Sequence, residues 1–219
     1  MITALLLAVG VSFLSAYPVE SHRAINLIED CESIHNILVT NLGEEYAVMA
    51  EAIVAPEIAM YTPIPDMAEY RSLCLLYVLY GQANFSIGLF QMKPSFARQV
   101  EAEVREDSLL MEKYGELLIH GSTEREVRKI RINRLMQLDW QTLYLAAFID
   151  IVQKITQKIP FVSPEEKVRH WATLYNAGIN LTPEQVREMQ AQKTFPHIQK
   201  TFNYGQAAVD FYENLSQSC

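Results

Sequence analysis

The chain has 219 residues, of which 50% are hydrophobic and 20% are charged. This composition allows one domain with a substantial core and excludes a disordered or fibrous protein. The formal net charge is −8 at pH 7 and no run of Lys and Arg forms a basic stripe, so we expect no nucleic-acid partner.

Residues 1–16 contain no charged side chain and are rich in Leu, Val and Ala. Such a run is too short to span a bilayer comfortably. It predicts a signal peptide cleaved near Ser15-Ala16, leaving residues 17–219 as the mature domain with no transmembrane span. The expected location is the periplasm or the outside of the cell. Because a basic n-region is missing, an N-terminal helix buried in the core is the alternative.

The three cysteines, Cys31, Cys74 and Cys219, are widely spaced, and the five histidines are scattered. Neither set has the spacing of metal ligands, so we expect no metal site and no cofactor. A disulfide between two of the cysteines is compatible with an oxidising compartment, but the spacing does not select a pair. Cys74 lies in an apolar helical run, which favours a buried thiol.

The periodic segments are almost all helical. Residues 44–61 have apolar residues at helical intervals, and Pro56 predicts a kink or an end within them. Residues 66–80 predict a second, strongly apolar helix that ends at Gly81, a good position for a left-handed cap.

Further along, Pro94 opens a predicted helix over residues 95–106. Residues 106–134 are polar with both charge signs, which favours a solvated helix or a long excursion. Residues 138–158 are the longest apolar-periodic segment and predict the central core helix. A final amphipathic helix is expected over residues 202–215.

Two sequences have the form of helix starts: Ser163-Pro-Glu-Glu166 and Thr182-Pro-Glu-Gln185. No segment is a convincing strand, although a brief extended conformation is compatible with residues 37–40 or 85–91. No internal repeat or low-complexity linker divides the chain. We therefore predict a single domain that is all-α or mostly α.

Two short motifs stand out. Residues 86–95 read Ser-Ile-Gly-Leu-Phe-Gln-Met-Lys-Pro-Ser, and residues 175–178 read Tyr-Asn-Ala-Gly. The first predicts a glycine-containing turn followed by a new helix. The second predicts a helix end at which the backbone turns on a glycine, and a simple glycine cap is its purely structural interpretation.

Glu57 is the candidate catalytic carboxylate. It follows Pro56 in an otherwise apolar window, residues 54–58. Apolar surroundings disfavour the charged form of a carboxyl group and raise its pKa. A raised pKa keeps a general acid protonated near neutral pH. Taken alone, this feature favours a solvent-facing glutamate at a helix end, and the two motifs change that weighting.

Residues 86–95 resemble the glycine-leucine-methionine-glutamine segment of the soluble lytic transglycosylases and goose-type lysozymes. In that group a proline and a small hydroxyl residue commonly follow, as Pro94 and Ser95 do here. Residues 175–178 match the tyrosine-asparagine-alanine-glycine signature of the same group, and the glutamate and the two motifs occur in the same order. The resemblance covers about residues 44–215 and implies a single lysozyme-like helical domain.

The resemblance also implies a role for each motif residue. Glu57 would act as the general acid and then as the base. Gln91 would hydrogen-bond sugar, Gly88 would allow close backbone approach or an unusual φ, Tyr175 would orient Glu57 through its hydroxyl, and Asn176 would fix the loop or contact the sugar. The implied substrate-binding residues are Ser86, Gly88, Leu89, Phe90, Gln91, Tyr175 and Asn176.

The implied activity is cleavage of the β-1,4 bond between N-acetylmuramic acid and N-acetylglucosamine in peptidoglycan glycan strands. Glycosidases ordinarily use two carboxylates. Only Glu57 has motif support here, although Asp66 is placed in the chain where it could fold back toward the cleft. One glutamate is enough if the muramoyl 6-hydroxyl is the nucleophile, which gives a 1,6-anhydro product. Hydrolysis by water is the alternative.

Two departures from the family pattern open further alternatives. Ile58 stands where a serine usually follows the catalytic glutamate, which favours a catalytically inactive lysozyme-like module that binds glycan or scaffolds an envelope complex. The interval from Glu57 to Gln91 is long (91 − 57 = 34 residues), so Glu51 or Glu69 is the fallback acid. The third alternative is an unrelated helical domain, in which Glu57 and the two motifs would not meet at one cleft.

Overall fold

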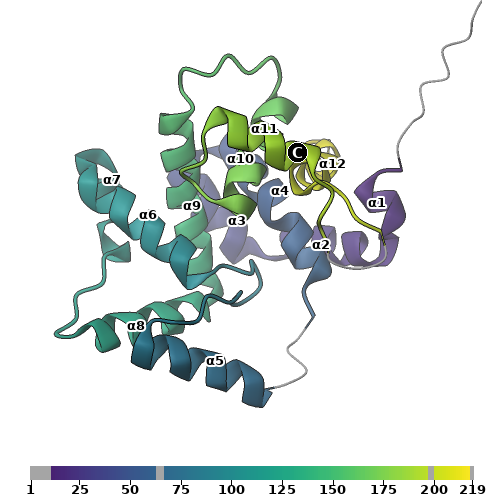
Figure 1. The fold of residues 1–219 in the computed structure, drawn as a ribbon. Coiled ribbons are helices and arrows are strands. Elements are labelled where there is room, and N and C mark those ends of the chain that lie inside the picture. Colours follow the sequence, from purple (N-terminus) through teal and green to yellow (C-terminus); the bar gives the residue numbers. More distant parts are fainter. Residues whose placement is uncertain (1–10, 63–66, 197–199, 218–219) are drawn as a thin grey trace, which may run out of the picture.

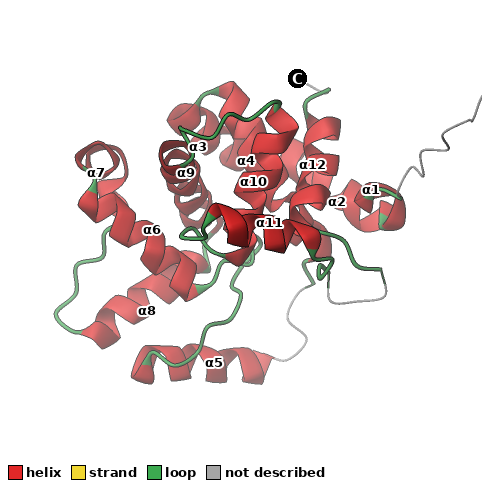
Figure 2. Cartoon of the chain, turned by 45° about the horizontal axis from the view of Figure 1, so that its top comes forward, coloured by secondary structure: helices red, strands yellow, loops and turns green. Residues whose placement is uncertain are grey.

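The computed structural model describes residues 11–62, 67–196 and 200–217. They form α-helices joined by loops, with no β-strand among them (Figures 1 and 2). The predicted all-α single domain is therefore confirmed. Its helices are α1 (Phe13–Ala16), α2 (Pro18–Asp30), α3 (Glu32–Leu42), α4 (Glu44–Met60), α5 (Met67–Tyr80), α6 (Pro94–Glu106), α7 (Ser108–Tyr114), the 3-10 helix η1 (Gly115–Leu117), α8 (Glu124–Leu135), α9 (Leu138–Ile155), α10 (Pro164–Ala177), α11 (Pro183–Ala191) and α12 (Tyr204–Leu215).

Helix α4 lies in the centre of the domain. Every residue from Ala47 to Pro56 is buried, and the helix contacts α2, α3, α9, α10 and α12. A helix that is buried on all sides must be apolar on all sides, which explains the run of Ala, Val, Met and Ile. Glu51 within this run and Glu57 directly after it therefore stand out physically as well as in the sequence.

Pro56 does not end α4, because the helix continues to Met60. Proline removes one intrahelical hydrogen bond, and the packing of neighbouring helices around α4 outweighs that loss. Residues 37–40, for which an extended conformation was an option, lie within α3. Helices α2 and α3 were not expected from periodicity, although Ala24 and Ile28, and Ile34 and Leu38, are buried pairs four residues apart.

Most of the predicted helix ends are confirmed. Pro94 is the first residue of α6, and Gly81 has a left-handed φ of 70° with its N–H bonded to the Tyr77 carbonyl. Ser163 caps α10, and Thr182 forms a complete capping box with Gln185. These local rules succeeded because a cap depends on residues that are neighbours in the sequence.

Other boundaries differ from the prediction. The central helix α9 ends at Ile155, and α12 begins at Tyr204, because the backbone of Phe202 pairs with that of Phe195 instead of joining the helix. The polar stretch 106–134 contains α7, η1 and α8. Residues 85–91 form no strand, but Ile87 and Met92 make an isolated antiparallel bridge.

Of the predicted signal peptide, residues 1–10 lie outside the described residues. Phe13 belongs to α1 and is fully buried against the rings of Phe195, Phe202 and Phe211. Cleavage near Ala16, which stays a prediction, would remove Phe13 from this aromatic cluster. No helix within the described ranges has the length and apolar character required to cross a membrane.

Cys31 and Cys74 are both free thiols, and Cys219 lies outside the described residues. Cys74, which was expected to be buried, is half-buried on α5. Burial nevertheless raises the pKa of its thiol. A thiol with a raised pKa is mostly protonated at neutral pH and is therefore weakly nucleophilic.

A buried ionic network fixes α5, which belongs to the long interval after Glu57. Arg131 on α8 forms a bidentate pair with Glu101 on α6, at 2.9 and 2.5 Å. The same guanidinium donates to the Tyr77 hydroxyl of α5 at 2.8 Å, and the Tyr144 hydroxyl of α9 donates to Glu101 at 2.7 Å. This network joins four helices, and Figures 1 and 2 both show α5 lying beside α8 at the edge of the domain.

Candidate active site

A cavity of about 430 Å³ lies where the end of α4, the turn before α6 and the end of α10 meet. Glu57, Ser86, Gln91, Tyr175 and Asn176 all line it. These residues come from three distant parts of the sequence, so their meeting is a result of the tertiary fold. The predicted convergence of Glu57 and both motifs on one cleft is confirmed.

Glu57 is the one carboxylate among the described residues that line this cavity. Burial raises the pKa of its carboxyl group to about 7, and the nearby positive charge of Lys93 opposes that rise. No described residue donates a hydrogen bond to Glu57, so among the described residues the Lys93 charge alone favours its charged form. At neutral pH a substantial fraction of Glu57 is therefore protonated and able to donate a proton.

The first motif folds into a tight turn that forms one wall of the cavity. The backbones of Ile87 and Met92 exchange two hydrogen bonds of 3.0 Å, and the loop between them reverses the chain. Gln91 adopts a left-handed φ of 49°, and its side-chain amide donates to the Gly88 carbonyl at 2.7 Å. The side-chain oxygen of Gln91 is left as a hydrogen-bond acceptor for a ligand.

Gly88 has the predicted unusual φ, at 70°, but its close approach is to another residue. It does not line the cavity, and a Cβ placed on it would lie 1.5 Å from the side-chain nitrogen of Gln141 and 2.8 Å from the Leu135 carbonyl oxygen. The Gln141 side chain in turn accepts from the Phe90 N–H at 2.8 Å. The glycine therefore lets α9 hold the turn in place, rather than letting sugar approach the backbone.

Leu89 and Phe90 were expected to line the cleft, but neither is among its lining residues. Phe90 is fully buried, and Leu89 packs against the core. They are apolar because they anchor the turn to the domain. The contribution of Phe90 toward the site is its backbone carbonyl, which accepts a hydrogen bond of 2.7 Å from the Tyr175 hydroxyl.

Tyr175 connects the two motifs at the inner side of the cavity. Its ring packs edge-on against Phe96 and Phe148, and burial together with the negative charge of Glu57 raises its pKa well above the ordinary value. A hydroxyl has one proton, and that of Tyr175 is donated to Phe90. Tyr175 therefore does not orient Glu57 by donating a hydrogen bond to it, and its hydroxyl oxygen can act toward Glu57 only as a hydrogen-bond acceptor.

The rest of the second motif lies at the rim. Asn176 is exposed and lines the cavity, and Gly178 ends α10 with a φ of 130° that only glycine adopts easily. The Gly178 N–H bonds to the Leu174 carbonyl at 2.9 Å. The motif is thus both a helix cap and part of the cavity wall, as the sequence indicated.

Sequence reasoning did not assign several residues to the site. Those from α6 share one face of its first turns, a pattern that helical spacing could have revealed once Pro94 was known to start a helix at the cavity. Phe195 had no local signal, since it arrives from the far end of the chain. The additional lining residues are Asn84, Met92, Lys93, Ser95, Phe96, Gln99, Ala177, Gly178 and Phe195.

The fallback acids lie elsewhere. Glu51 lines a different cavity, and Glu69 is exposed on α5. Asp66, the candidate second carboxylate, lies outside the described residues. Ile58 is 2% exposed within the core and does not line the cavity, so the missing serine would not have faced this space.

Within the described residues, no group of three or more His, Cys, Asp or Glu side chains is placed to hold a metal ion. Comparisons with protein-family models, with curated proteins and with solved structures gave no match to this chain. The geometry of the cavity and its two motifs are therefore the features from which a function is inferred.

Proposed function

We propose that the protein is a peptidoglycan lytic enzyme of the lysozyme-like superfamily, which cleaves the β-1,4 bond between N-acetylmuramic acid and N-acetylglucosamine. The observation that supports this most directly is Glu57, a carboxyl group with a pKa of about 7 in a cavity built from both motifs. The proposed location is the periplasm or the outside of the cell, where such a substrate is found.

The lining of the cavity suits a glycan. Ser86, Gln91 and Asn176 offer neutral hydroxyl and amide groups, and Asn84, Ser95 and Gln99 add more of the same kind. Sugar hydroxyl and acetamido groups both donate and accept hydrogen bonds, and these side chains do the same. Glu57 and Lys93 are the two charged side chains among the described residues of a lining that is otherwise neutral, which supports a glycan substrate over a strongly charged one.

In the proposed reaction, protonated Glu57 donates its proton to the glycosidic oxygen, and the bond from that oxygen to C1 of the muramoyl sugar breaks. The resulting Glu57 carboxylate then accepts the proton of the muramoyl 6-hydroxyl as that oxygen bonds to C1. The products are a 1,6-anhydro-muramoyl end and a free 4-hydroxyl. A cavity with one carboxylate favours this route over a two-carboxylate hydrolysis.

The alternative is a catalytically inactive module that binds glycan or scaffolds an envelope complex. The sequence feature that favoured the inactive module is Ile58 in place of a serine. Because Ile58 is buried away from the cavity, this feature is weaker support for an inactive module. The two functions differ in one observable property. The enzyme releases soluble fragments from cell-wall sacculi, whereas the module binds sacculi without releasing product.

The decisive experiment is digestion of purified sacculi followed by mass spectrometry of the soluble products. We expect muropeptides with 1,6-anhydro ends, which are lighter by one water than the corresponding reducing ends. A mass spectrum with reducing ends alone would show hydrolysis instead. Binding to sacculi without any soluble product would support the inactive module and contradict the proposal.

Activity should fall as the pH rises through about 7, the pKa of Glu57. Glu57 must be protonated to act as the acid, and its protonated fraction falls about tenfold for each pH unit above its pKa. Initial rates of sacculus solubilisation between pH 5 and 9, at constant ionic strength, would show this descending limb of the pH–rate profile.

In Lys93→Met the descending limb should move to higher pH, because the Lys93 charge lowers the pKa of Glu57. A limb near pH 4.5, the ordinary value of a glutamate, would contradict the assignment.

A further inference from the structure

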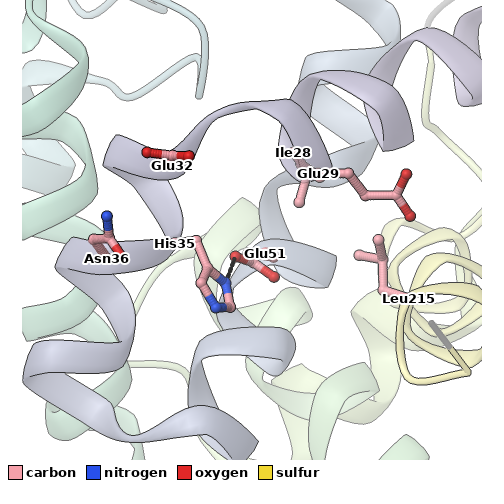
Figure 3. Close-up of a pocket in the computed structure, with 7 residues that line it drawn as sticks. All are labelled: Ile28, Glu29, Glu32, His35, Asn36, Glu51 and Leu215. Carbon is pink, nitrogen blue, oxygen red and sulfur yellow. Dashed lines mark hydrogen bonds and ion pairs between the residues drawn. The ribbon is translucent and has the colours of Figure 1, made fainter. Parts of the chain in front are cut away.

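A second cavity, of about 590 Å³, opens between α2, α3, α4 and the end of α12 (Figure 3). Its charged and titratable lining residues are Glu29, Glu32, His35 and Glu51. No lysine or arginine of the described part of the chain lines it. Neither motif reaches it, so the proposed glycan cleavage gives it no role.

Glu51 is the unusual residue of this cavity. It is 4% exposed on the central helix α4, and its Oε1 is hydrogen-bonded to Nδ1 of His35 at 3.0 Å. Its other oxygen accepts no hydrogen bond from any described residue, and it points away from His35 toward the side of the cavity where Leu215 lies (Figure 3). This oxygen is accessible from the cavity rather than sealed in the core, so a ligand donor in the cavity can hydrogen-bond to it.

His35 does not neutralise the cavity. Its Nδ1 faces Glu51, and its Nε2 lies 3.5 Å from Glu44, which is exposed beside it. Any positive charge on the ring is therefore shared between these two carboxylates. Glu29 and Glu32 are exposed at the cavity and have no cationic partner among the described residues.

The remaining lining has a different character. Ile28 and Leu215 are buried apolar side chains on opposite helices, and both face the cavity (Figure 3). A ligand that fits must offer hydrogen-bond donors and positive charge to the glutamates and an apolar part to these two side chains. A bare metal ion lacks the apolar part, and the described residues contain no cluster arranged for one.

We propose that this cavity binds a primary ammonium group carried on an aliphatic chain. The ammonium would donate to the open oxygen of Glu51, with Glu29 and Glu32 adding attraction, while the methylene chain packs against Ile28 and Leu215. A free diamine and a lysine side chain on a peptide both have this chemistry. The inference is independent of the proposed glycan cleavage, because the two cavities share no residue.

The first test is calorimetric titration of the full chain at low salt with 1,5-diaminopentane. Uncharged 1,5-pentanediol, which has the same chain length, is the matched control ligand. We expect saturable binding of the diamine and at least about tenfold weaker binding of the diol, since hydrogen bonds to charged groups contribute more than neutral ones. Equal binding of the two, or no binding of the diamine, would overturn the proposal.

Titration with Nα-acetyl-lysine-N-methylamide then distinguishes the two sources of the ammonium group. Binding as tight as that of the diamine assigns a peptide-borne lysine, and weaker binding assigns a free amine.

Variants locate the site. Glu51→Gln should weaken diamine binding by about tenfold or more, the loss expected when a charged hydrogen bond becomes neutral. Because Glu51 is buried, the double variant Glu29→Gln with Glu32→Gln, at two exposed positions, provides a test that the fold tolerates, and we expect a loss of similar size. Glu188→Gln, an exposed change of the same charge on α11, should leave affinity within about twofold. An equal loss in Glu188→Gln would show diffuse attraction and contradict the proposal.

Discussion

Glu57→Gln should reduce the release of soluble fragments from sacculi by about 10²- to 10⁴-fold, the range expected for loss of a general acid. Glutamine has almost the same shape as protonated glutamic acid, but its amide cannot transfer a proton to the glycosidic oxygen. It also cannot take the proton of the attacking hydroxyl in the second step. The measurement is the initial rate of product release, quantified by chromatography of the soluble fraction at the pH optimum.

The matched control is Glu45→Gln, the same change at an exposed position in the first turn of α4. It should leave the rate of release within about twofold, since surface substitutions away from special features have small effects. The helical circular dichroism of both variants should equal that of the unmodified chain. Undiminished release by Glu57→Gln would remove Glu57 from the mechanism.

The raised pKa of Glu57 also predicts how the stability of Glu57→Gln compares with that of the unmodified chain. In the folded state this pKa is raised to about 7 from an ordinary 4.5, so the folded protein binds more protons than the unfolded chain between these values. The contribution of Glu57 to stability is therefore fully present below about pH 4.5 and is lost as the pH rises through 7. Glutamine carries no charge at any pH, so Glu57→Gln should be at least as stable as the unmodified chain at pH 8. A gain in stability with a loss of activity is typical of a catalytic group.

The sequence predicted the parts of the site that depend on neighbouring residues. Pro94 predicted a helix start, Gly178 a helix end, and the apolar window around Glu57 its raised pKa. Each of these inferences needs only the chain within a few residues of the position. The family resemblance supplied the remaining step, which was to expect that these three segments meet.

The sequence did not predict what the partners of these residues would be. Position 88 must be glycine because the Gln141 side chain, on the distant helix α9, occupies the space of a Cβ. The Tyr175 hydroxyl donates its hydrogen bond to the Phe90 carbonyl. Phe195 enters the cavity wall from the far end of the chain. These contacts are set by how helices pack, and packing depends on long-range shape rather than on local pattern.

Glu101→Ala should destabilise the fold by about 3–5 kcal/mol, the cost of removing one partner from a buried ion pair. Glu101 and Arg131 are 3% and 5% exposed, so without the carboxylate the guanidinium would be a buried charge whose remaining hydrogen bond to the described residues is to the Tyr77 hydroxyl. The Tyr144 hydroxyl would also lose its acceptor. Urea unfolding followed by circular dichroism measures the loss as a lower midpoint.

Two controls separate this effect from a general sensitivity to charge removal. Arg187→Ala breaks an ion pair with Glu184 whose side chains are 68% and 70% exposed, and it should leave the urea midpoint almost unchanged. The double variant Glu101→Met with Arg131→Met removes both charges and should recover much of the loss, because a buried pair is often replaceable by apolar residues. If Glu101→Ala cost no more than Arg187→Ala, the network would not be what fixes α5 and α8 to α6. The start of α6 lies at the cavity, which Lys93 and Ser95 line together with Glu57. The single variant should therefore also lower activity at temperatures where it remains folded, whereas the double variant should keep it.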